Sequence, residues 1–372
     1  MVNYKAMIQS FYIHNFKNFE ELILPQLKRV NLIVGKNNVG KSTLLEAMAV
    51  YLSEGDEFCL KDILQARGEE LPYSRQIDST QELVKDRLLS LFHDWKEDYS
   101  KDYCIKLAEQ KDNPVTINQV YIADYRNDGI TDGKTLYVYH QEDIDAADGK
   151  LTITTGGLLS QKANGGGANI IRYDHALPFA SKPFKKIPYQ MVHTVDFNSY
   201  SNATLYDKIS LSPLEDYIVK ALNIINENID RITFVTEELR ERYRVPVVSL
   251  KNSGKRVRLS SMGDGLNRVL TIILSLLNSK DGVLLLDEFE TGLHYSVQKQ
   301  LWEIIFMLAE ELNIQVFVTS HSSDCLKTFS KTNTKEQGML IRLEQRKSGI
   351  TPVCYTDNKD IAFASENSIE LR

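Results

Sequence analysis

One segment restricts the fold of this chain more than any other: a glycine loop between a predicted strand and a predicted helix. Residues 35–42 read GKNNVGKS and fit the GxxxxGK[ST] pattern. They follow the apolar strand Val30–Val34 and precede a helical pattern that places Leu44 and Met48 on one face. With the glycine content of this chain, a chance match has a probability on the order of 0.01. An ordinary glycine turn is therefore a weak alternative to a phosphate-binding loop.

The loop predicts a site for the phosphates of ATP. Its glycines let backbone N–H groups surround phosphate oxygens, Lys41 reaches the β- and γ-phosphates, and Ser42 can ligate Mg²⁺. We therefore predict ATP and Mg²⁺ as cofactors and Lys41 as a catalytic residue. The predicted nucleotide-binding residues of the loop are Gly35, Lys36, Asn37, Asn38, Val39, Gly40, Lys41, Ser42 and Thr43.

A second motif supplies two carboxylates. Residues 283–288 read VLLLDE, an apolar strand that ends in adjacent acids. Two acids at the end of a buried strand are costly unless they serve a cation or act as a base. We expect Asp287 to join Ser42 in holding Mg²⁺, and Glu288 to orient or deprotonate the attacking water. The alternative is that both acids only cap the following helix.

Two other polar turns adjoin apolar segments. Residues 259–265, LSSMGDG, open the apolar helix Leu266–Leu277, and a helix start of this kind either binds an anion or is a plain N-cap. Residues 316–321, VFVTSH, form an apolar strand with His321 at its tip. Because ligand chemistry gathers at the carboxyl ends of parallel strands, we predict a γ-phosphate contact for His321 rather than a purely structural role.

The order of elements predicts an α/β fold. Helices and apolar strands alternate from Leu266 to Val318, which is typical of a mainly parallel sheet. The start of the chain is predicted to be a β-rich lobe, and residues 205–229 are predicted to be helical. The predicted strands outside the motifs above are Met7–His14, Phe19–Leu24, Ile232–Val235, Val245–Leu250 and Val257–Leu259.

The spacing of the motifs predicts a discontinuous ATPase domain. Lys41 and Asp287 lie much farther apart than a compact P-loop domain of about 100–200 residues requires. We therefore assign residues 1–60 and 205–345 to the ATPase domain and residues 61–204 to an inserted α+β segment for partner recognition or dimerisation. Residues 346–372 are predicted to be a C-terminal tail.

Composition narrows the class of protein. Hydrophobic residues make up 42% and charged residues 25% of the 372 positions, which excludes fibrous and mainly disordered chains. The formal net charge of −6 gives no overall basic field for nucleic acid or anionic lipid. The four cysteines are widely spaced, which favours reduced thiols. No long apolar run indicates a signal peptide or a membrane span, so we expect a cytoplasmic protein.

Together the motifs resemble those of the ABC-class P-loop ATPases, the group that includes SMC proteins, RecF and the OLD (overcoming-lysogenization-defect) family. The resemblance covers about residues 1–60 and 205–345. It rests on IHNFKNFEELIL, VGKNNVGKSTLLEAM, SSMGDGLNRVL, LLLDEFETGLH and VFVTSHSSD. No long heptad pattern fills the insertion, so SMC-like coiled-coil arms are not expected.

The resemblance assigns roles to several residues. In such families the serine-and-glycine signature of one subunit contacts the γ-phosphate bound by the other subunit. This implies a homodimer or higher oligomer in which Ser261 and Gly263 act across the interface, with Ser260 as the weaker alignment. It also implies that Glu290–His294 faces the partner and that His321 is the switch histidine.

Three further features lie outside these motifs. Gln190 is a candidate for the glutamine that often follows the P-loop helix. Trp95 and its apolar neighbours are predicted to be insertion core rather than a docking surface. Two basic clusters are predicted to be solvated surface rather than phosphate contacts. The neighbours of Trp95 are Leu88, Leu89, Leu91 and Phe92, and the clusters are Lys251, Lys255, Arg256 and Arg258, and Lys182, Lys185 and Lys186.

The sequence predicts a slow ATPase that acts as a nucleotide-dependent switch or sensor in a prokaryotic anti-phage defence assembly. After His321 the chain continues only to Arg372, too short for the fused nuclease domain of full-length OLD enzymes, so a separate nuclease or toxin is the expected effector. One alternative is a DNA-repair ATPase resembling RecF. Another is a scaffold that holds ATP without turnover.

Overall fold

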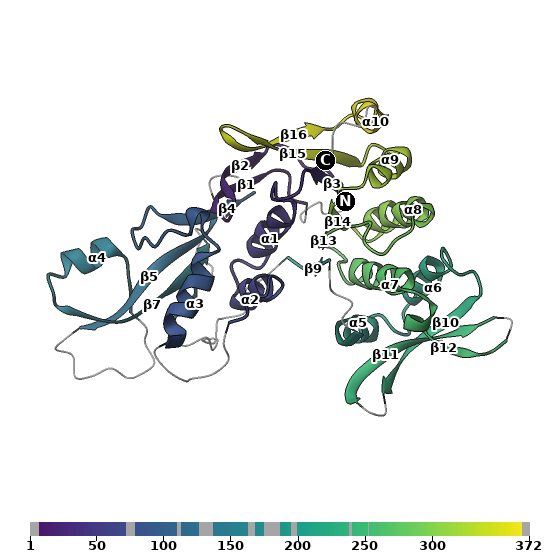
Figure 1. The fold of residues 1–372 in the computed structure, drawn as a ribbon, viewed down its shortest axis with the longest axis horizontal. Coiled ribbons are helices and arrows are strands. Elements are labelled where there is room, and N and C mark those ends of the chain that lie inside the picture. Colours follow the sequence, from purple (N-terminus) through teal and green to yellow (C-terminus); the bar gives the residue numbers. More distant parts are fainter. Residues whose placement is uncertain are drawn as a thin grey trace.

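The computed structural model describes residues 7–71, 79–109, 113–125, 137–162, 168–174, 187–194, 199–237, 240–251 and 253–366. The described chain forms three sheets, and helices pack against each of them (Figure 1). This arrangement confirms the predicted α/β class with a mainly parallel core sheet and a β-rich lobe. Among the described residues, no helix is both long enough and apolar enough to cross a bilayer.

The core sheet has six strands in the order β16-β15-β3-β14-β13-β9. All neighbouring pairs are parallel except β15 and β16. Parallel strands place their carboxyl ends at one edge, where the turns that follow β3, β9, β13 and β14 meet. The strands are β3 (Val30–Gly35), β9 (Tyr189–Val192), β13 (Val283–Leu286), β14 (Gln315–Thr319), β15 (Gly338–Arg346) and β16 (Gly349–Tyr355).

Both faces of the core sheet are covered, which explains the uninterrupted apolar runs of its strands. Leu284 and Leu286 face a core built with α5–α10, whereas Val283 and Leu285 face a core built with α1 and the N-terminal lobe. The helices on the first side are α5 (Ser199–Asp207), α6 (Glu215–Leu222), α7 (Asp264–Leu277), α8 (Tyr295–Glu311), α9 (Ser323–Thr332) and α10 (Asn358–Glu366).

The N-terminal lobe is an antiparallel sheet in the order β2-β1-β4-β5-β7-β8, with β6 beside β5. Helix α1 (Lys41–Leu52) lies between this sheet and the core sheet (Figure 1). The strands are β1 (Phe11–Phe16), β2 (Phe19–Leu24), β4 (Cys104–Ala108), β5 (Val115–Tyr125), β6 (Val138–Tyr139), β7 (Leu151–Lys162) and β8 (Ala168–Arg172). Its helices are α2 (Glu57–Gln65), α3 (Ser79–Leu89), the 3₁₀ turn η1 (His93–Trp95) and α4 (Gln141–Ala146).

A third sheet, β10-β11-β12, extends from the helical side of the core (Figure 1). It contains β10 (Ile229–Glu237), β11 (Arg240–Leu250) and β12 (Arg256–Arg258). Strand β12 runs directly into the 3₁₀ turn η2 (Leu259–Met262), which carries the serines of the predicted signature. The three strands predicted here therefore form, and β10 and β11 are longer than their apolar segments indicated.

The structure divides the chain differently from the sequence. Residues 61–204 are not one inserted unit, because β4, β5, β7 and β8 continue the sheet of β1 and β2, while β9 pairs with β13 in the core sheet. Residues 346–372 are not merely a tail, because β16 is a strand of the core sheet and α10 packs on α9. Pairing between distant strands depends on tertiary contacts that local patterns do not encode.

The predicted helix over residues 205–229 is also corrected. Helix α5 ends at Asp207 and α6 begins at Glu215, with Pro213 between them. Proline lacks an N–H donor, and Ser212 Oγ accepts from Leu214 N at 3.3 Å, so the turn competes with a continuous helix. Strand β1 begins at Phe11, four residues later than predicted.

Candidate functional site

The glycine loop lies where the sequence predicted it, between β3 and α1. Two of its glycines are required by geometry. A Cβ at Gly35 would lie 2.6 Å from Leu343 O, and one at Gly40 would lie 2.7 Å from Phe19 Cζ. Gly40 also has φ +93°, a conformation that side-chain-bearing residues rarely adopt. The loop therefore keeps its shape because β15 and the β1–β2 turn pack directly against it.

Lys41 lies across the loop. Its Nζ donates to Gly35 O and Lys36 O, both at 2.9 Å. Burial lowers the pKa of Lys41, while the carboxylates of Asp287, Glu290 and Glu288 act in the opposite direction. The ammonium group is thus held over the loop by backbone oxygens.

Asp287 is the meeting point of four strand ends. Its Oδ1 accepts from Ser42 Oγ at 3.0 Å and from Thr319 Oγ1 at 2.5 Å, and its Oδ2 accepts from Thr194 Oγ1 at 3.3 Å. Ser42 follows β3, Thr319 ends β14 and Thr194 follows β9, while Asp287 follows β13. The parallel core sheet thus gathers one carboxylate and three hydroxyls at one place.

This group of oxygens fits Mg²⁺. Mg²⁺ prefers hard oxygen ligands and usually uses one or two carboxylates together with substrate phosphates and water. The described residues contain no group of three or more His, Cys, Asp or Glu side chains that could hold a metal. An ion that takes most of its ligands from phosphate and water does not need such a group. Ser42 and Asp287 are the residues that would hold it.

Glu288 adopts an uncommon backbone conformation with φ +48°. Its backbone N–H donates to Thr319 Oγ1 at 2.8 Å, and its Oε2 accepts from Thr291 Oγ1 at 3.0 Å. The buried Arg268 guanidinium donates to Asp287 O at 2.6 Å and to Glu288 O at 2.9 Å. Backbone and side chain are therefore both fixed, and the carboxylate lies at the cleft beside Asp287.

His321 also lies at the cleft and is coupled to Glu290. Its backbone N–H donates to Glu290 Oε1 at 2.8 Å, and its Nε2 lies 3.5 Å from the same oxygen. Glu290 Oε2 is buried and has no hydrogen-bond partner among the described residues. The acidic segment after β13 thus holds the histidine that follows β14.

The predicted signature lies apart from these residues. Ser260, Ser261 and Gly263 are exposed, and none of them lines the cleft that contains Lys41, Asp287, Glu288 and His321. Gly263 has φ +111° and open space around its Cβ position. The structure therefore brings together the loop, the acidic strand and the histidine of one chain, but not its signature.

Several residues of the site were missed by the sequence reasoning. Thr319 and Thr194 bind Asp287, and Arg268 supports its backbone. Thr319 lies in the apolar strand VFVTSH, where a hydroxyl just before the strand end is a recognisable pattern. Thr194 follows a strand of only four residues, which has no clear pattern of its own. Gln190 lies within β9 and does not line the cleft. Thr194 occupies the position beside Asp287.

An ion cluster borders the cleft next to the loop. Lys17 Nζ lies 2.8 Å from Glu46 Oε2, and Arg67 donates to both oxygens of Glu46 at 2.9 Å. The side chains of Lys17 and Glu46 are 8% and 5% exposed. Burial lowers the pKa of Lys17, and Glu46 opposes that shift. Two cations therefore share one buried carboxylate on α1.

The prediction that Trp95 and its apolar neighbours are core residues holds for the neighbours but not for Trp95 itself. Leu88, Leu91 and Phe92 are fully buried and Leu89 is nearly so, as predicted for core residues, but the core that the first three join is that of the N-terminal lobe and not of a separate insertion. Trp95 itself is 66% exposed and lines the same cleft as the loop. Of the basic clusters, Lys182, Lys185 and Lys186 lie outside the described residues.

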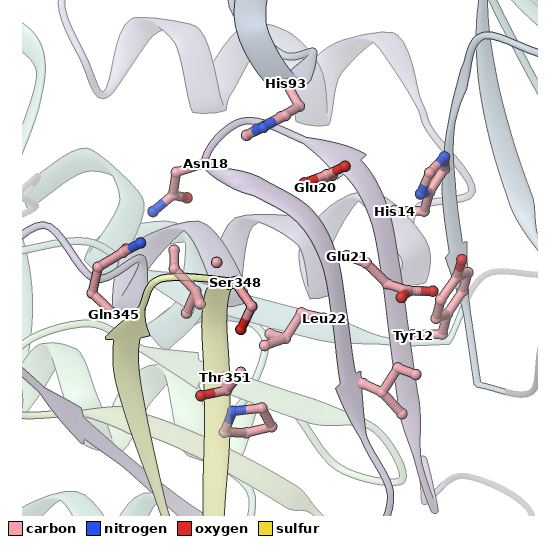
Figure 2. A pocket seen from close by; sticks show the side chains of 14 residues that line it. Tyr12, His14, Asn18, Glu20, Glu21, Leu22, His93, Gln345, Ser348 and Thr351 are labelled. Carbon is pink, nitrogen blue, oxygen red and sulfur yellow. The ribbon is translucent and has the colours of Figure 1, made fainter.

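A second cleft, of about 670 Å³, lies on the other side of the β1–β2 turn. Figure 2 shows Glu20 and Glu21 of β2 on one side of it and Gln345 and Ser348 of the β15–β16 hairpin on the other. Lysine and arginine are absent from its described lining. Its acidic side chains do not suit a polyphosphate, so the cleft of about 1060 Å³ at the glycine loop is the candidate nucleotide site.

Two family models match the chain. The model described as "AAA ATPase domain" matches residues 7–151, which include the glycine loop. The model described as "AAA domain, putative AbiEii toxin, Type IV TA system" matches residues 198–324, which include the signature, the acidic strand and His321. The matches include the glycine loop, Asp287, Glu288 and His321, whereas Thr194 lies between the two matched ranges.

Similar proteins extend the comparison. The chain is 25% identical over 400 residues to an ATP/GTP phosphatase of Helicobacter pylori, covering 98% of this chain and all of that protein. It is 42% identical over 69 residues to an uncharacterized protein of Methanocaldococcus jannaschii, covering 17% of this chain and 32% of that protein. Among solved structures, an Smc head bound to the C-winged helix domain of ScpA has a TM-score of 0.51 at 12% identity, covering 95% of this chain and 99% of that chain. The structural likeness concerns the fold.

Proposed function

We propose that this chain, an ABC-like P-loop ATPase of the SMC/RecF/OLD type, works as a Mg²⁺- and ATP-dependent dimeric switch in the cytoplasm of a prokaryote. Its two nucleotide sites form between subunits. Closure of the dimer on ATP and opening after slow hydrolysis control a separate effector in an anti-phage defence assembly.

The exposed signature carries this proposal. Every other nucleotide motif of the chain borders one cleft, whereas Ser261 and Gly263 lie on the surface away from it. A polar turn at the start of the apolar helix α7 suits an anion, because its N–H groups and the helix dipole point outward. The phosphate that it would bind is therefore one held by a second copy of the chain.

The residues of the cleft have complementary roles in this proposal. Lys41 and the loop N–H groups bind the β- and γ-phosphates, and Ser42 and Asp287 hold Mg²⁺, which neutralises charge on the phosphates. Glu288 accepts the proton of the attacking water from a backbone that Arg268 and Thr319 keep in place. His321, held by Glu290, contacts the γ-phosphate. Thr319 and Thr194 orient the Asp287 carboxylate.

ATP-dependent dimerisation tests the proposal. Glu288→Gln retains the shape of the side chain but cannot act as a base, so the variant should accumulate as a dimer with Mg²⁺ and ATP and remain a monomer without nucleotide. Light scattering after size exclusion measures the mass. Ser261→Arg in the Glu288→Gln background is the matched control and should stay monomeric. A monomeric Glu288→Gln protein that is saturated with ATP would contradict the switch.

The defence context is supported by the family description for residues 198–324, which names a toxin of a toxin–antitoxin system. Cells that carry the gene with its encoded neighbours should restrict phage, and Lys41→Ala should abolish the restriction. Plating efficiency measures both. Equal restriction by the wild type and the variant would show that nucleotide binding does not control the effector.

One observation favours the RecF-like alternative. Arg256 lies beside Ser249, which lies beside Arg231, so the two arginines stand in one row across the third sheet. Arg258, two residues after Arg256, pairs with Glu237 at 3.0 Å, and Arg231 Nε lies 3.8 Å from Asp230 Oδ2, so both carboxylates reduce the positive charge of the sheet. If this sheet binds duplex DNA, affinity should fall steeply with salt, and Arg231→Ala with Arg256→Ala should reduce the salt slope by about two. Salt-independent or absent binding removes this alternative.

A further inference from the structure

We propose that Trp95 recognises the base of the bound nucleotide, its indole stacking on a purine ring. This inference rests on the proposed nucleotide site and adds the class of base that the site accepts. It assigns a specificity role to a residue outside the nucleotide motifs.

Trp95 is in the right place for such a contact. The loop that would bind the phosphates and the indole of Trp95 line one continuous cleft of about 1060 Å³. Trp95 is 66% exposed, whereas Leu91 and Phe92 just before it are fully buried, as is the other tryptophan, Trp302. A tryptophan that is mostly exposed presents a large apolar surface to solvent, and a nucleobase offers a flat surface of matching size.

The backbone turns this ring outward. Asp94 and Trp95 both have left-handed backbone angles, with φ +61° and +56°. Such angles are costly for residues with bulky side chains and are kept only where the surroundings fix them. The Trp95 N–H donates to Phe92 O at 3.3 Å, which closes the turn just after the buried residues. The chain thus leaves the lobe core and presents Trp95 at the cleft.

The turn is tied to the glycine loop through the β1–β2 connection. The Lys17 N–H donates to Leu91 O at 2.9 Å, and His93 Nδ1 lies 2.7 Å from Lys17 O. Tyr103 Oη donates to His93 O at 3.0 Å. The next residue is Asn18, whose Nδ2 lies 2.8 Å from the position that a Cβ atom at Gly40 would take. Trp95 is therefore held at a fixed position relative to the phosphate-binding loop.

Two carboxylates that line the cleft suit a base with an exocyclic amino group. Asp94 and Glu69 line the same cleft, and Glu69 Oε2 accepts from Ser90 Oγ at 2.8 Å. Carboxylates accept hydrogen bonds from the exocyclic amino groups of adenine, guanine and cytosine, so the preference for a purine rests on the stacking contact. Every base can stack on an aromatic ring, but the stacking free energy becomes more favourable as the area of the base increases. The site should therefore take ATP and GTP and bind pyrimidine nucleotides more weakly.

A comparison of ATP with inorganic tripolyphosphate tests the inference by calorimetry with Mg²⁺. Trp95→Ala should weaken ATP binding about 10-fold, the scale of one lost base stack. It should leave tripolyphosphate binding unchanged, because that ligand has no base. Trp95→Phe should retain most of the ATP affinity. Phe363→Ala, which truncates another exposed aromatic ring, on α10 and outside the cleft, should change neither ligand.

The outcomes separate this inference from the proposed function. If Trp95→Ala binds ATP as tightly as the wild type while tripolyphosphate binds both, the base contact is wrong and the P-loop site stands. If neither ligand binds the wild type, the nucleotide site itself is wrong. Equal affinity of the wild type for ATP and CTP would also overturn the purine preference. A further readout is tryptophan fluorescence, which ATP should quench in the wild type and much less in Trp95→Phe.

Discussion

The P-loop lysine shows how burial can make a binding residue sensitive to pH. Burial lowers the pKa of Lys41, so this ammonium loses its proton at a lower pH than an ordinary lysine. Below its pKa in the free protein the cation is present and ATP affinity should be constant. As pH rises through that pKa, affinity should fall by up to about tenfold per pH unit, because ATP binding then requires uptake of a proton.

Calorimetry from pH 7 to pH 10 checks this expectation. Lys41→Arg is the matched control, since a guanidinium stays charged over the whole range. It should bind ATP more weakly than the wild type but without the alkaline loss. The same alkaline loss in Lys41→Arg would assign the titration to another group.

The Lys17–Glu46–Arg67 cluster should matter for stability. Glu46→Gln leaves the buried Lys17 ammonium without its carboxylate partner, and breaking a buried pair in this way costs about 3–5 kcal/mol. Urea denaturation should show this loss of unfolding free energy at pH 7. Lys17→Met together with Glu46→Gln should be much less destabilised, since no buried charge then remains unpaired. Additive losses in the double variant would mean that the two residues do not interact.

At the residue scale, motifs with a fixed order identified residues that the structure places around one cleft, whereas contacts from distant segments were missed. The loop residues, Asp287 and His321 each stand directly after an apolar strand, which is the signal that a sequence can carry. Thr194 was missed because β9 is short and lies next to β13 only in the folded chain. Lys17 lies within the motif IHNFKNFEELIL, but its ion pair with Glu46 forms only when the N-terminal lobe packs against α1.

At the scale of elements, the start of α1 depends on contact with the β1–β2 turn. Gly40→Ala adds a Cβ 2.7 Å from Phe19 Cζ at a backbone angle of φ +93°, so it should cost roughly 1–3 kcal/mol and weaken ATP binding. Thermal unfolding and calorimetry measure the two effects. Gly149→Ala has a similar positive angle, φ +76°, but open space around the added atom. A loss of stability as large in Gly149→Ala would assign the effect to backbone strain alone.

The elements themselves were predictable to different degrees. The core-sheet strands β3, β13 and β14 and the helix α7 follow from strong local patterns, because both faces of the sheet are buried and α7 is almost entirely buried. The division into sheets was not predictable, since β4 pairs with β1 although α1, α2 and α3 separate the two strands in the sequence, and β5 and β7 then extend the same sheet. Local periodicity specifies an element but not its neighbour.

At the scale of the whole molecule, the separation of signature and cleft makes a prediction about mixed dimers. Lys41→Ala should be inactive for want of bound nucleotide, and Ser261→Arg because a bulky cation blocks closure over the partner's phosphate. In a mixed dimer, the intact loop of the Ser261→Arg chain faces the intact signature of the Lys41→Ala chain. One sound site is thereby restored, so activity should return on mixing.

The restored rate should reach up to about half of the wild-type rate if the two sites act independently, and less if they are coupled. The measurement is the ATPase rate against mixing ratio after subunit exchange, with heterodimers confirmed by differential tags. The matched control mixes the wild type with a chain that carries both changes. In that mixed dimer, one site has an intact loop opposite a blocked signature, and the other site has a defective loop. If Ser261 instead served its own subunit, the control would gain activity beyond its residual wild-type homodimer and the mixture of single variants would stay inactive. Inactivity of both mixtures would mean that the dimer turns over only when both of its sites are intact.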